Sequence, residues 1–545
     1  MIAGLLNSFP KDYNPNPQQI KLLKNIDQAF TDGHKFVICN APTGSGKSFI
    51  SKTIGNVADE CTGEFRDTVL NYLAFKRGHG GSYTYEDECY DEKAFGCTAL
   101  TITKALQDQY KDLFEDIEAL KGKSNYRCAV DDTFSVEIAP CLHTPKLRDE
   151  CWSKGICPYY EQRNKALVST FNTLNYNMFF SLPDHLKKRQ YLICDEAAQL
   201  EDQLVKEFSC NINFEFLKKM EIPIRPIYTK GNNVIKWISV LVLDLKEKVD
   251  WLNDAISSKS AVRSKKYIIE KKSELIQLNN LHSKLSLIID SWHESEYIYD
   301  KDAKSITFMP LKVDKLSNHL FKYADKVILM SATIIDPSNF CKNLGIDKFK
   351  YVEAESSFNP DSAPIFCNTK VKLNYYNMSK NLPKIAKQVE EICNFHKNEK
   401  GIIHTQNNNI TSYLADNLRG NRYLIREPGV RNEDILDQHI ANDDPTVLIS
   451  PSLTHGVDLK DNLARFQIII KAPFLPTRDK RIEKMMKGDF VWYENKMLCS
   501  LIQACGRGVR SHKDHCTTYI LDAAVVESII RNKYKLPKYF LDRFC

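Results

Sequence analysis

The sequence predicts an α/β protein built on parallel sheets, and three observations lead to this fold class. Short apolar runs recur along the 545 residues, as is typical of strands buried on both faces of a sheet. The clearest of these runs are residues 36–39, 191–194, 327–330, 401–404, 447–450, 466–470 and 519–522. Helical patterns lie between many of them, and this alternation is typical of α/β domains. Polar residues follow several runs, at the strand ends where such sheets bind ligands.

Composition excludes several classes of protein. A hydrophobic fraction of 43% and a charged fraction of 26% are those of a globular chain, not of a disordered or fibrous one. At about 150 residues per domain, the length allows roughly three or four domains. The net charge of +6 is compatible with a polyanionic partner but identifies none, because many enzymes carry a similar charge.

The N-terminus lacks the features of a signal peptide, and no run reaches the ~18 apolar residues that cross a bilayer. We therefore expect an intracellular protein, in the cytoplasm or, in a eukaryotic cell, alternatively in the nucleus. In a reducing compartment its 17 cysteines are metal ligands or core thiols rather than disulfides.

A phosphate-binding loop follows the first predicted strand. Residues 41–48 read APTGSGKS and lead into a helical pattern, which is the context that this motif requires. Its glycines let backbone N–H groups surround a β-phosphate, and the helix N-terminus adds its dipole. Lys47 is expected to contact the β- and γ-phosphates, and Ser48 to bind Mg²⁺. The other predicted nucleotide-binding residues of the loop are Thr43, Gly44, Ser45 and Gly46.

An acid pair follows the predicted strand 191–194. Asp195 is expected to hold Mg²⁺ through water, and Glu196 to polarise the attacking water. An Asp-Glu pair after an apolar run is by itself more often a surface turn. The phosphate loop upstream favours the catalytic interpretation.

Two later segments narrow the class further. Ser331-Ala-Thr333 follows the run 327–330, and Gln503-Ala-Cys-Gly-Arg507-Gly-Val-Arg510 lies near the C-terminus. The two arginines are three residues apart and so share one face of a helix. Arginines supplied by a second domain can stabilise charge on a transferring phosphoryl group. The alternative is that they are structural or contact nucleic acid.

The order of these motifs resembles that of DinG/XPD-type superfamily 2 DNA helicases, which carry an iron–sulfur cluster. The matching motifs are APTGSGKS, TKALQDQY (103–110), DEAA (195–198), SAT (331–333), THGVDL (454–459) and QACGRGVR (503–510). Further local matches are LKGKSNYRC (120–128), CPYYEQRNKA (157–166) and PFLP (473–476). The resemblance runs through most of the chain, and its gaps are confined to the insertions.

The resemblance implies two RecA-like motor domains, with a cysteine-rich iron–sulfur domain and a helical arch both inserted in the first. The expected ranges are 1–120, 166–204 and 319–340 for motor domain 1, 121–165 for the iron–sulfur domain, 205–318 for the arch and 341–545 for motor domain 2. It also implies that the protein uses ATP to unwind DNA duplexes that carry a single-stranded tail. The protein is then expected to move 5′ to 3′ along the single-stranded DNA.

Further roles are carried over by position. Gln19 matches an adenine-recognising glutamine, and Gly456 and Asp458 match the loop that couples ATP to the strand. The final helicase motif of the family is matched by Gln503, Arg507 and Arg510. Candidate strand contacts are Thr103, Lys104 and Thr454, although Thr103 could equally cap a helix.

The sequence departs from the family at three places. The usual DEAH reads DEAA, so no histidine links the acid pair to the second domain. We expect ATP hydrolysis to survive, because Asp195 and Glu196 carry its chemistry. We expect the coupling between this acid pair and the second domain to be altered. Asn16 stands where the family commonly has arginine, and residues 61–96 form an extra stretch without an assigned role.

Four cysteines lie in the predicted iron–sulfur domain. Cys128, Cys141, Cys151 and Cys157 are separated by 12, 9 and 5 residues. Because no Cys-x-x-Cys is present, this spacing alone favours buried or idle thiols over a metal site. The resemblance instead implies that the four hold one [4Fe–4S] cluster, with zinc as the alternative. Such a metal would stabilise a loop-rich lobe that has only a small hydrophobic core.

Other cysteines are interpreted differently. Cys194 and Cys505 are expected to be packed in a strand and a helix, whereas Cys89 and Cys97 are rival ligands without a matching context.

The predicted arch is mostly helical and lysine-rich. One helical face is marked by Leu275, Leu278, Leu281, Leu285, Ile288 and Trp292, at spacings of three and four. A cluster of lysines precedes it, at positions 265, 266, 271 and 272. A solvated face is favoured for these lysines over a patch that contacts a nucleic-acid strand.

The function predicted from the sequence is therefore an ATP- and Mg²⁺-dependent DNA helicase, expected to act as a monomer away from membranes and without an appended nuclease domain. One alternative is a nucleic-acid-stimulated translocase that does not unwind, or one that acts on RNA. Another is a nucleotide-switched scaffold, which the retained Glu196, Arg507 and Arg510 argue against, because a switch could lose them.

Overall fold

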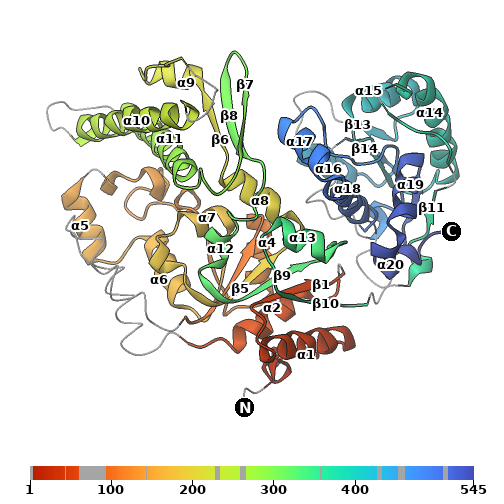
Figure 1. Ribbon diagram of the computed structural model, residues 1–545, viewed down its shortest axis with the longest axis horizontal. Helices are drawn as coiled ribbons and strands as arrows, with labels where there is room; N and C mark the ends of the chain where they lie inside the picture. Colours follow the sequence, from red (N-terminus) through yellow and green to blue (C-terminus); the bar gives the residue numbers. More distant parts are fainter. Residues whose placement is uncertain are drawn as a thin grey trace. The chain divides into compact units, whose positions relative to one another are not determined.

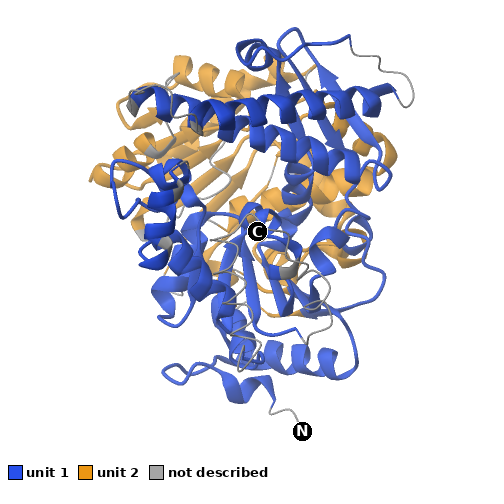
Figure 2. Cartoon of the chain, turned by 90° about the vertical axis from the view of Figure 1, so that its left-hand side faces the viewer, with its two compact units in different colours: residues 1–39, 48–330, 341–352 blue, residues 40–47, 331–340, 353–545 orange. Residues whose placement is uncertain are grey.

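The chain folds into two compact units, which are described separately (Figures 1 and 2). The computed structural model describes residues 4–42, 44–60, 94–142, 144–226, 233–257, 265–355, 359–367, 369–374, 376–425, 432–451, 461–506, 508 and 514–545. Unit 1 comprises residues 1–39, 48–330 and 341–352, and unit 2 comprises residues 40–47, 331–340 and 353–545.

A seven-stranded sheet forms the centre of unit 1, apart from the last residues of three strands, which cluster with unit 2. Its strand order is β10-β1-β9-β5-β2-β4-β3, and the register is parallel from β3 through β4, β2 and β5 to β9. The strands are β1 (Phe36–Asn40), β2 (Cys97–Thr101), β3 (Glu118–Leu120), β4 (Phe171–Asn175), β5 (Arg189–Asp195), β9 (Ala324–Ser331) and β10 (Phe349–Glu353). The predicted runs 36–39, 191–194 and 327–330 lie in β1, β5 and β9, which confirms the parallel-sheet prediction.

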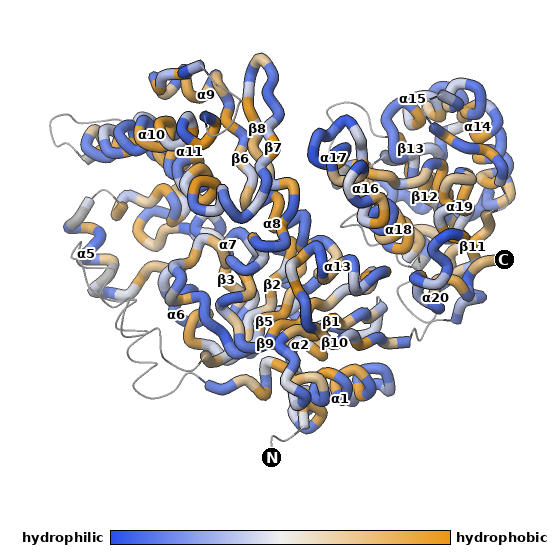
Figure 3. Tube along the Cα trace, in the orientation of Figure 1, coloured by the Kyte–Doolittle hydropathy of each residue, from blue (hydrophilic) through white to orange (hydrophobic). Residues whose placement is uncertain are grey.

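Helices surround this sheet. They are α1 (Pro17–Thr31), α2 (Lys47–Asn56), α4 (Lys104–Leu113), α6 (Pro158–Val168), α7 (Tyr176–Ser181), α8 (Leu200–Glu207), α12 (Asn318–Phe321) and α13 (Pro337–Asn343). Short 3-10 helices complete the connections of both units, namely η1 (Leu5–Ser8), η2 (Lys123–Asn125), η3 (Val136–Ile138), η4 (Pro140–Leu142), η5 (Asp184–Leu186), η6 (Ala197–Gln199), η7 (Pro360–Ser362), η8 (Asp461–Leu463) and η9 (Lys533–Lys535). Hydrophobic residues concentrate in the strands, and hydrophilic residues dominate outer helices such as α17 (Lys480–Gly488) (Figure 3).

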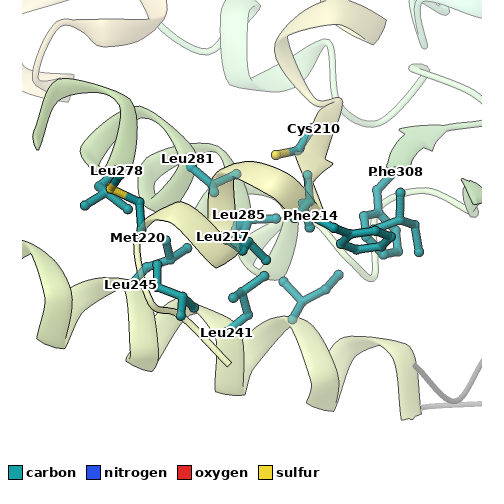
Figure 4. Packing of buried hydrophobic residues seen from close by; sticks show 14 of the residues in the cluster. Cys210, Phe214, Leu217, Met220, Leu241, Leu245, Leu278, Leu281, Leu285 and Phe308 are labelled. Carbon is teal, nitrogen blue, oxygen red and sulfur yellow. The ribbon is translucent and has the colours of Figure 1, made fainter. Parts of the chain in front are cut away.

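The predicted arch range contains two long helices and a small antiparallel sheet. The long helices are α10 (Asn233–Ser257) and α11 (Lys265–Asp290), and the short helix α9 (Phe214–Lys219) precedes them. The sheet has the order β6-β8-β7, formed by β6 (Cys210–Asn213), β8 (Ser305–Pro310) and β7 (Tyr297–Lys301). The predicted apolar face of α11 is buried against α10 and the sheet, as Figure 4 shows for Leu278, Leu281 and Leu285. The sheet itself was not predicted, because its strands are short.

The cysteine-bearing range 121–165 is a small lobe with few regular elements. It contains α5 (Pro145–Ser153), the start of α6 and short 3-10 helices. Its core consists of Cys128, Phe134 and Ala139, with Ile138, Cys141 and Ile269 packed against it. Because Ile269 lies on α11, the arch completes the core of this lobe.

Unit 2 is built on a six-stranded sheet of order β11-β16-β15-β12-β14-β13, and its strands pair in parallel. The strands are β11 (Ile365–Phe366), β12 (Gly401–His404), β13 (Tyr423–Ile425), β14 (Val447–Ser450), β15 (Phe466–Ile469) and β16 (Thr517–Ile520). The remaining helices are α14 (Met378–Phe395), α15 (Asn408–Asn417), α16 (Asn432–Ala441), α18 (Phe490–Cys505), α19 (Ala523–Arg531) and α20 (Lys538–Leu541). The predicted run 519–522 overlaps only the end of β16, which begins two residues earlier.

Helices cover both faces of this second sheet. Ile468 packs with α14 and α15, whereas its neighbour Ile469 packs with α18, α19 and α20. Successive residues of a strand point to opposite faces, so the two cores lie on opposite sides of β15. Within the described residues of the chain, no helix combines the length and apolarity that a membrane span requires.

Candidate nucleotide site and cysteine lobe

The phosphate loop turns directly into α2, which begins at Lys47. Gly44 and Gly46 adopt φ values of +80° and +79°, a left-handed backbone that glycine enters without steric cost. The side chain of Ser45 is 4% exposed, and its Oγ has no hydrogen-bond partner among the described residues. A buried hydroxyl usually has a partner, so this polar cradle at a helix N-terminus fits a phosphate oxygen.

The acid pair lies at the end of β5. Asp195 is the last residue of that strand and is 5% exposed, while Glu196 is partly exposed. The backbone N–H of Glu196 donates to Oδ1 of Asp195 at 2.9 Å. Glu196 has a φ of +50°, which is unusual for a residue with a Cβ and is typical of strained functional positions.

The sheet orders these motifs at neighbouring strand ends. Strand β9 lies between β1 and β5, so the SAT motif at its end comes between the phosphate loop and the acid pair. The N–H of Val327 donates to the carbonyl of Lys35, and that of Ala41 donates to Ser331, as expected when β1 runs parallel to β9. Ligands of parallel sheets bind outside the carboxyl ends of the strands, where all three motifs stand.

A buried tyrosine contacts the acid pair, and the sequence analysis did not identify it. The hydroxyl of Tyr110, on α4, lies 3.3 Å from Oδ2 of Asp195 and 3.0 Å from Oγ of Ser51, on α2. Burial, and then the charge of Asp195, raise the pKa of Tyr110 well above its usual value, so the phenol stays protonated. The sequence carries no local signal for this contact, because Tyr110 lies 59 positions from Ser51 and 85 positions from Asp195.

Gln19 and Asn16 form a capping box at the start of α1. Oδ1 of Asn16 accepts from the N–H of Gln19 at 2.8 Å, and Oε1 of Gln19 accepts from the N–H of Asn16 at 2.9 Å. This reciprocal bonding gives a local reason for asparagine at position 16, because asparagine is among the best N-cap residues. Adenine recognition by Gln19 stays a prediction.

The two candidate nucleic-acid contacts at the start of α4 are both exposed; Thr103 is its N-cap and Lys104 its first residue. Oγ1 of Thr103 accepts from the N–H of Leu106 at 3.3 Å, so the alternative role of Thr103 as a helix cap is realised. Nζ of Lys104 donates to Oδ1 of Asn125 at 2.7 Å. Both residues follow β2, at the carboxyl end of the parallel strands where the acid pair also lies.

The described part of the final helicase motif lies in unit 2. Gln503, near the end of α18, donates from Nε2 to Oγ1 of Thr333 at 3.2 Å, which links this motif to SAT. Several predicted site residues lie outside the described residues, namely Thr43, Thr454, Gly456, Asp458, Arg507 and Arg510. Their roles stay predictions.

The four predicted ligand cysteines come together in the small lobe. Cys128 and Cys151 are buried, Cys141 and Cys157 are partly buried, and all four are free thiols. Burial, and after it the nearby Cys151, Cys128 and Cys157, raise the pKa of Cys141 to about 11. The thiols are thus close enough to influence one another.

Four cysteine thiolates are a usual ligand set for a [4Fe–4S] cluster, and zinc is bound by the same kind of set. Among the described residues, no group of three or more His, Cys, Asp or Glu side chains forms a site for a metal ion. The assignment of a [4Fe–4S] group to the four cysteines therefore stays a prediction.

Lys272 reaches from α11 into this lobe. Its side chain is buried, and Nζ donates to the carbonyls of Ile138 and Ala139 at 2.9 Å each. The sequence interpretation of a solvated lysine face is therefore wrong for Lys272, although Lys266 is exposed. Lys271 forms an ion pair with Glu274 at 2.8 Å.

Predictions from the sequence also cover four cysteines outside the predicted ligand set. Cys194 and Cys505 are fully buried in β5 and α18, as expected of packed residues. Cys97 is fully buried in β2, within the large sheet rather than in the lobe, so it is no rival ligand. Cys89 lies outside the described residues.

Comparisons with known proteins agree with this architecture. The helicase C-terminal domain family matches residues 402–540, which lie in unit 2. Among solved structures, the chain is similar to an XPD helicase, with a TM-score of 0.59 and 16% identity over 96% of this chain and 98% of the other. S. tokodaii Xpd4 has a TM-score of 0.53 and 14% identity over 94% and 97%. The fold is thus one of two RecA-like parallel-sheet domains, with insertions in the first.

Curated relatives point to the same class. The chain is 22% identical over 484 residues to ATP-dependent DNA helicase CHL1 of Vanderwaltozyma polyspora, covering 70% of this chain and 57% of the relative. It is 21% identical over 479 residues to CHL1 of Kluyveromyces lactis, covering 70% and 58%. The chain therefore spans less than two thirds of the length of these relatives. Together with the solved structures, they confirm the resemblance to DinG/XPD-type superfamily 2 helicases.

Proposed function

We propose that this chain is an ATP-dependent DNA helicase that hydrolyses ATP between two RecA-like domains and moves 5′ to 3′ on single-stranded DNA. The observation that carries the proposal is the order of three motifs at neighbouring strand ends, with the phosphate loop after β1, SAT after β9 and the acid pair after β5. The helicase C-terminal domain match and the CHL1 relatives support the same function.

In the proposed site, the side chain of Lys47 and the N-terminal N–H groups of α2 bind the β- and γ-phosphates of ATP. Ser48 and Asp195 hold Mg²⁺, which when bound neutralises charge that develops on the phosphates. Glu196 orients the attacking water and accepts its proton. The N–H of Glu196 donates to Oδ1 of Asp195 and so helps to keep this carboxylate in place.

The second domain completes the proposed motor. Arg507 and Arg510 stabilise charge on the transferring phosphoryl group, and Gly456 and Asp458 couple the nucleotide state to the strand. Thr103, Lys104 and Thr454 contact the DNA backbone. Such contacts give little sequence preference and a strong dependence on salt.

The proposed role of the small lobe is to help separate the strands, with Cys128, Cys141, Cys151 and Cys157 holding a [4Fe–4S] cluster. When bound, the cluster replaces the core that so short a segment lacks. The electrostatic influence of Cys128, Cys151 and Cys157 on the pKa of Cys141 supports this assignment. Anaerobically purified protein should contain iron and sulfide in about equal amounts and absorb visible light; stoichiometric zinc in a colourless sample would contradict the cluster.

Unwinding of 5′-tailed and 3′-tailed DNA duplexes tests the proposed function. The chain should unwind the 5′-tailed duplex with ATP, and Lys47→Ala should abolish this activity. Lys24→Ala is the matched control, because Lys24 is an exposed lysine of α1 and is not part of the phosphate loop.

The same assay separates the alternatives. DNA-stimulated ATP hydrolysis without strand separation would identify a translocase. Unwinding of RNA duplexes alone would show that the substrate is RNA and not DNA. Nucleotide binding without hydrolysis would identify a nucleotide-switched scaffold. Equal unwinding by the chain and by Lys47→Ala would contradict the motor proposal.

A further inference from the structure

Tyr110 connects three elements around the proposed Mg²⁺ site. Its side chain is 1% exposed, and its hydroxyl lies within hydrogen-bond distance of Ser51 on α2 and of Asp195 at the end of β5. Ser51 is fully buried and stands three residues after Ser48, on the same face of α2. The hydroxyl therefore bridges the two elements that carry the proposed Mg²⁺ ligands, Ser48 and Asp195.

The direction of these hydrogen bonds follows from the protons available. A carboxylate only accepts, and a tyrosine hydroxyl has one proton to give. The hydroxyl of Tyr110 is placed to donate this proton to Oδ2 of Asp195 and to Oγ of Ser51. Because all three side chains are buried, water cannot easily replace a lost partner, and an unpaired polar group there is costly.

Helix α4 is fixed to the sheet one turn before Tyr110. Nε2 of Gln107 donates to the carbonyls of Leu120 and Thr173 at 3.2 and 3.1 Å, and the side chain is fully buried. Thr103 and Lys104, the candidate strand contacts, stand at the other end of the same helix. Tyr110 stands seven positions after Thr103, a rise of roughly 10 Å along a helix.

We infer that Tyr110 is a positioning residue that orients the Asp195 carboxylate for Mg²⁺ and ties this orientation to the seating of α4. The inference rests on the proposed function, since it assigns Asp195 to Mg²⁺ and the start of α4 to the strand. A strand that docks on Thr103 and Lys104 holds α4 in place, and α4 in turn holds the Tyr110 hydroxyl against Asp195. Strand binding thereby favours the Mg²⁺-competent arrangement.

The test is a Mg²⁺ titration of steady-state ATP hydrolysis by Tyr110→Phe, with and without a single-stranded oligonucleotide. Removing the hydroxyl takes away one hydrogen bond to a buried carboxylate. The half-saturating Mg²⁺ concentration should rise about tenfold, while the rate at saturating Mg²⁺ changes much less. The oligonucleotide should lower this concentration in the unmodified chain and not in Tyr110→Phe.

Tyr297→Phe is the matched control. The Tyr297 hydroxyl lies 2.8 Å from Oγ of Ser291 in the arch range, so this variant removes the same kind of contact away from the acid pair. Its Mg²⁺ dependence should be that of the unmodified chain. If Tyr110→Phe does not fold, Ser51→Ala provides the same titration, because it removes the link between Tyr110 and α2.

Two results would overturn the inference. One is a lower rate or melting temperature for Tyr110→Phe with an unchanged Mg²⁺ half-saturation, which a merely structural role would produce. The other is an oligonucleotide effect as large in Tyr110→Phe as in the unmodified chain. Both leave the proposed motor intact as long as Lys47→Ala abolishes hydrolysis. Hydrolysis that survives Lys47→Ala would instead remove the proposed function itself.

Discussion

Replacing Lys272 by methionine should loosen the joint between the arch helix α11 and the cysteine lobe. Methionine keeps most of the apolar stem that lysine buries, and it removes the ammonium group. The carbonyls of Ile138 and Ala139, each 2.9 Å from Nζ, then lose their donor. Ile269 is left as a neighbouring contact of α11 with the core of the lobe.

The size of the effect follows from two opposing contributions. A hydrogen bond from a charged donor contributes about 1.5–3 kcal/mol, and Lys272 makes two. The desolvation of a buried ammonium costs several kcal/mol and offsets part of that gain. We expect a net loss of about 2 kcal/mol, which corresponds to a roughly 30-fold larger population of the opened lobe.

Amide hydrogen exchange within the lobe measures this opening directly. The N–H groups of Cys128 and Val136 bond the carbonyls of Phe134 and Tyr126, so their exchange reports local unfolding of the lobe. Both should exchange about 30-fold faster in Lys272→Met. Lys266→Met, an exposed lysine of the same helix, is the control and should leave both rates unchanged. Equal rates in Lys272→Met and the unmodified chain would refute the reasoning.

Three further predictions concern catalysis, pH and helix capping. Glu196→Gln should bind ATP normally in a calorimetric titration and hydrolyse it at least about 100-fold more slowly, because it removes the base that accepts the proton of water. His439 is fully buried, and burial lowers its pKa below 6.5, so the unfolded chain binds the extra proton first as the pH falls. Thermal stability should therefore decline as the pH falls below 6.5 and down through the folded pKa, and His439→Gln should make melting curves between pH 7.5 and 5.5 less dependent on pH. Asn16→Ala removes the cap of α1 and should cost about 1 kcal/mol of unfolding free energy in denaturant titrations, whereas an unchanged midpoint would show that the cap is not stabilising.

Much of the fold and nucleotide site could be predicted because their signals are local in the sequence. The phosphate loop depends on its own residues, Gly44, Gly46 and Lys47. The two glycines allow its left-handed backbone without help from distant segments. The buried strands are recognisable in the sequence as apolar runs. Asp195 and Glu196 directly follow one of these runs, residues 191–194. The stripe on α11 likewise needed only helical periodicity.

The remaining features depend on contacts between distant segments. Tyr110 meets Ser51 and Asp195 across 59 and 85 residues, and nothing in its own neighbourhood identifies these partners. Lys272 meets the lobe across more than 130 residues, and its lysine-rich surroundings favoured an exposed side chain. Strand β6 has four residues, too few for an alternating pattern to be distinguished from a loop.

Hydrolysis of bound ATP in a single turnover by Arg507→Ala, with single-stranded DNA present, tests most directly whether two RecA-like domains share one triphosphate. Removing an arginine that stabilises the transferring phosphoryl group should slow the chemical step about 10³-fold or more while ATP still binds. Chemistry at the unmodified rate, with full ATP binding and a folded protein, would contradict the shared site.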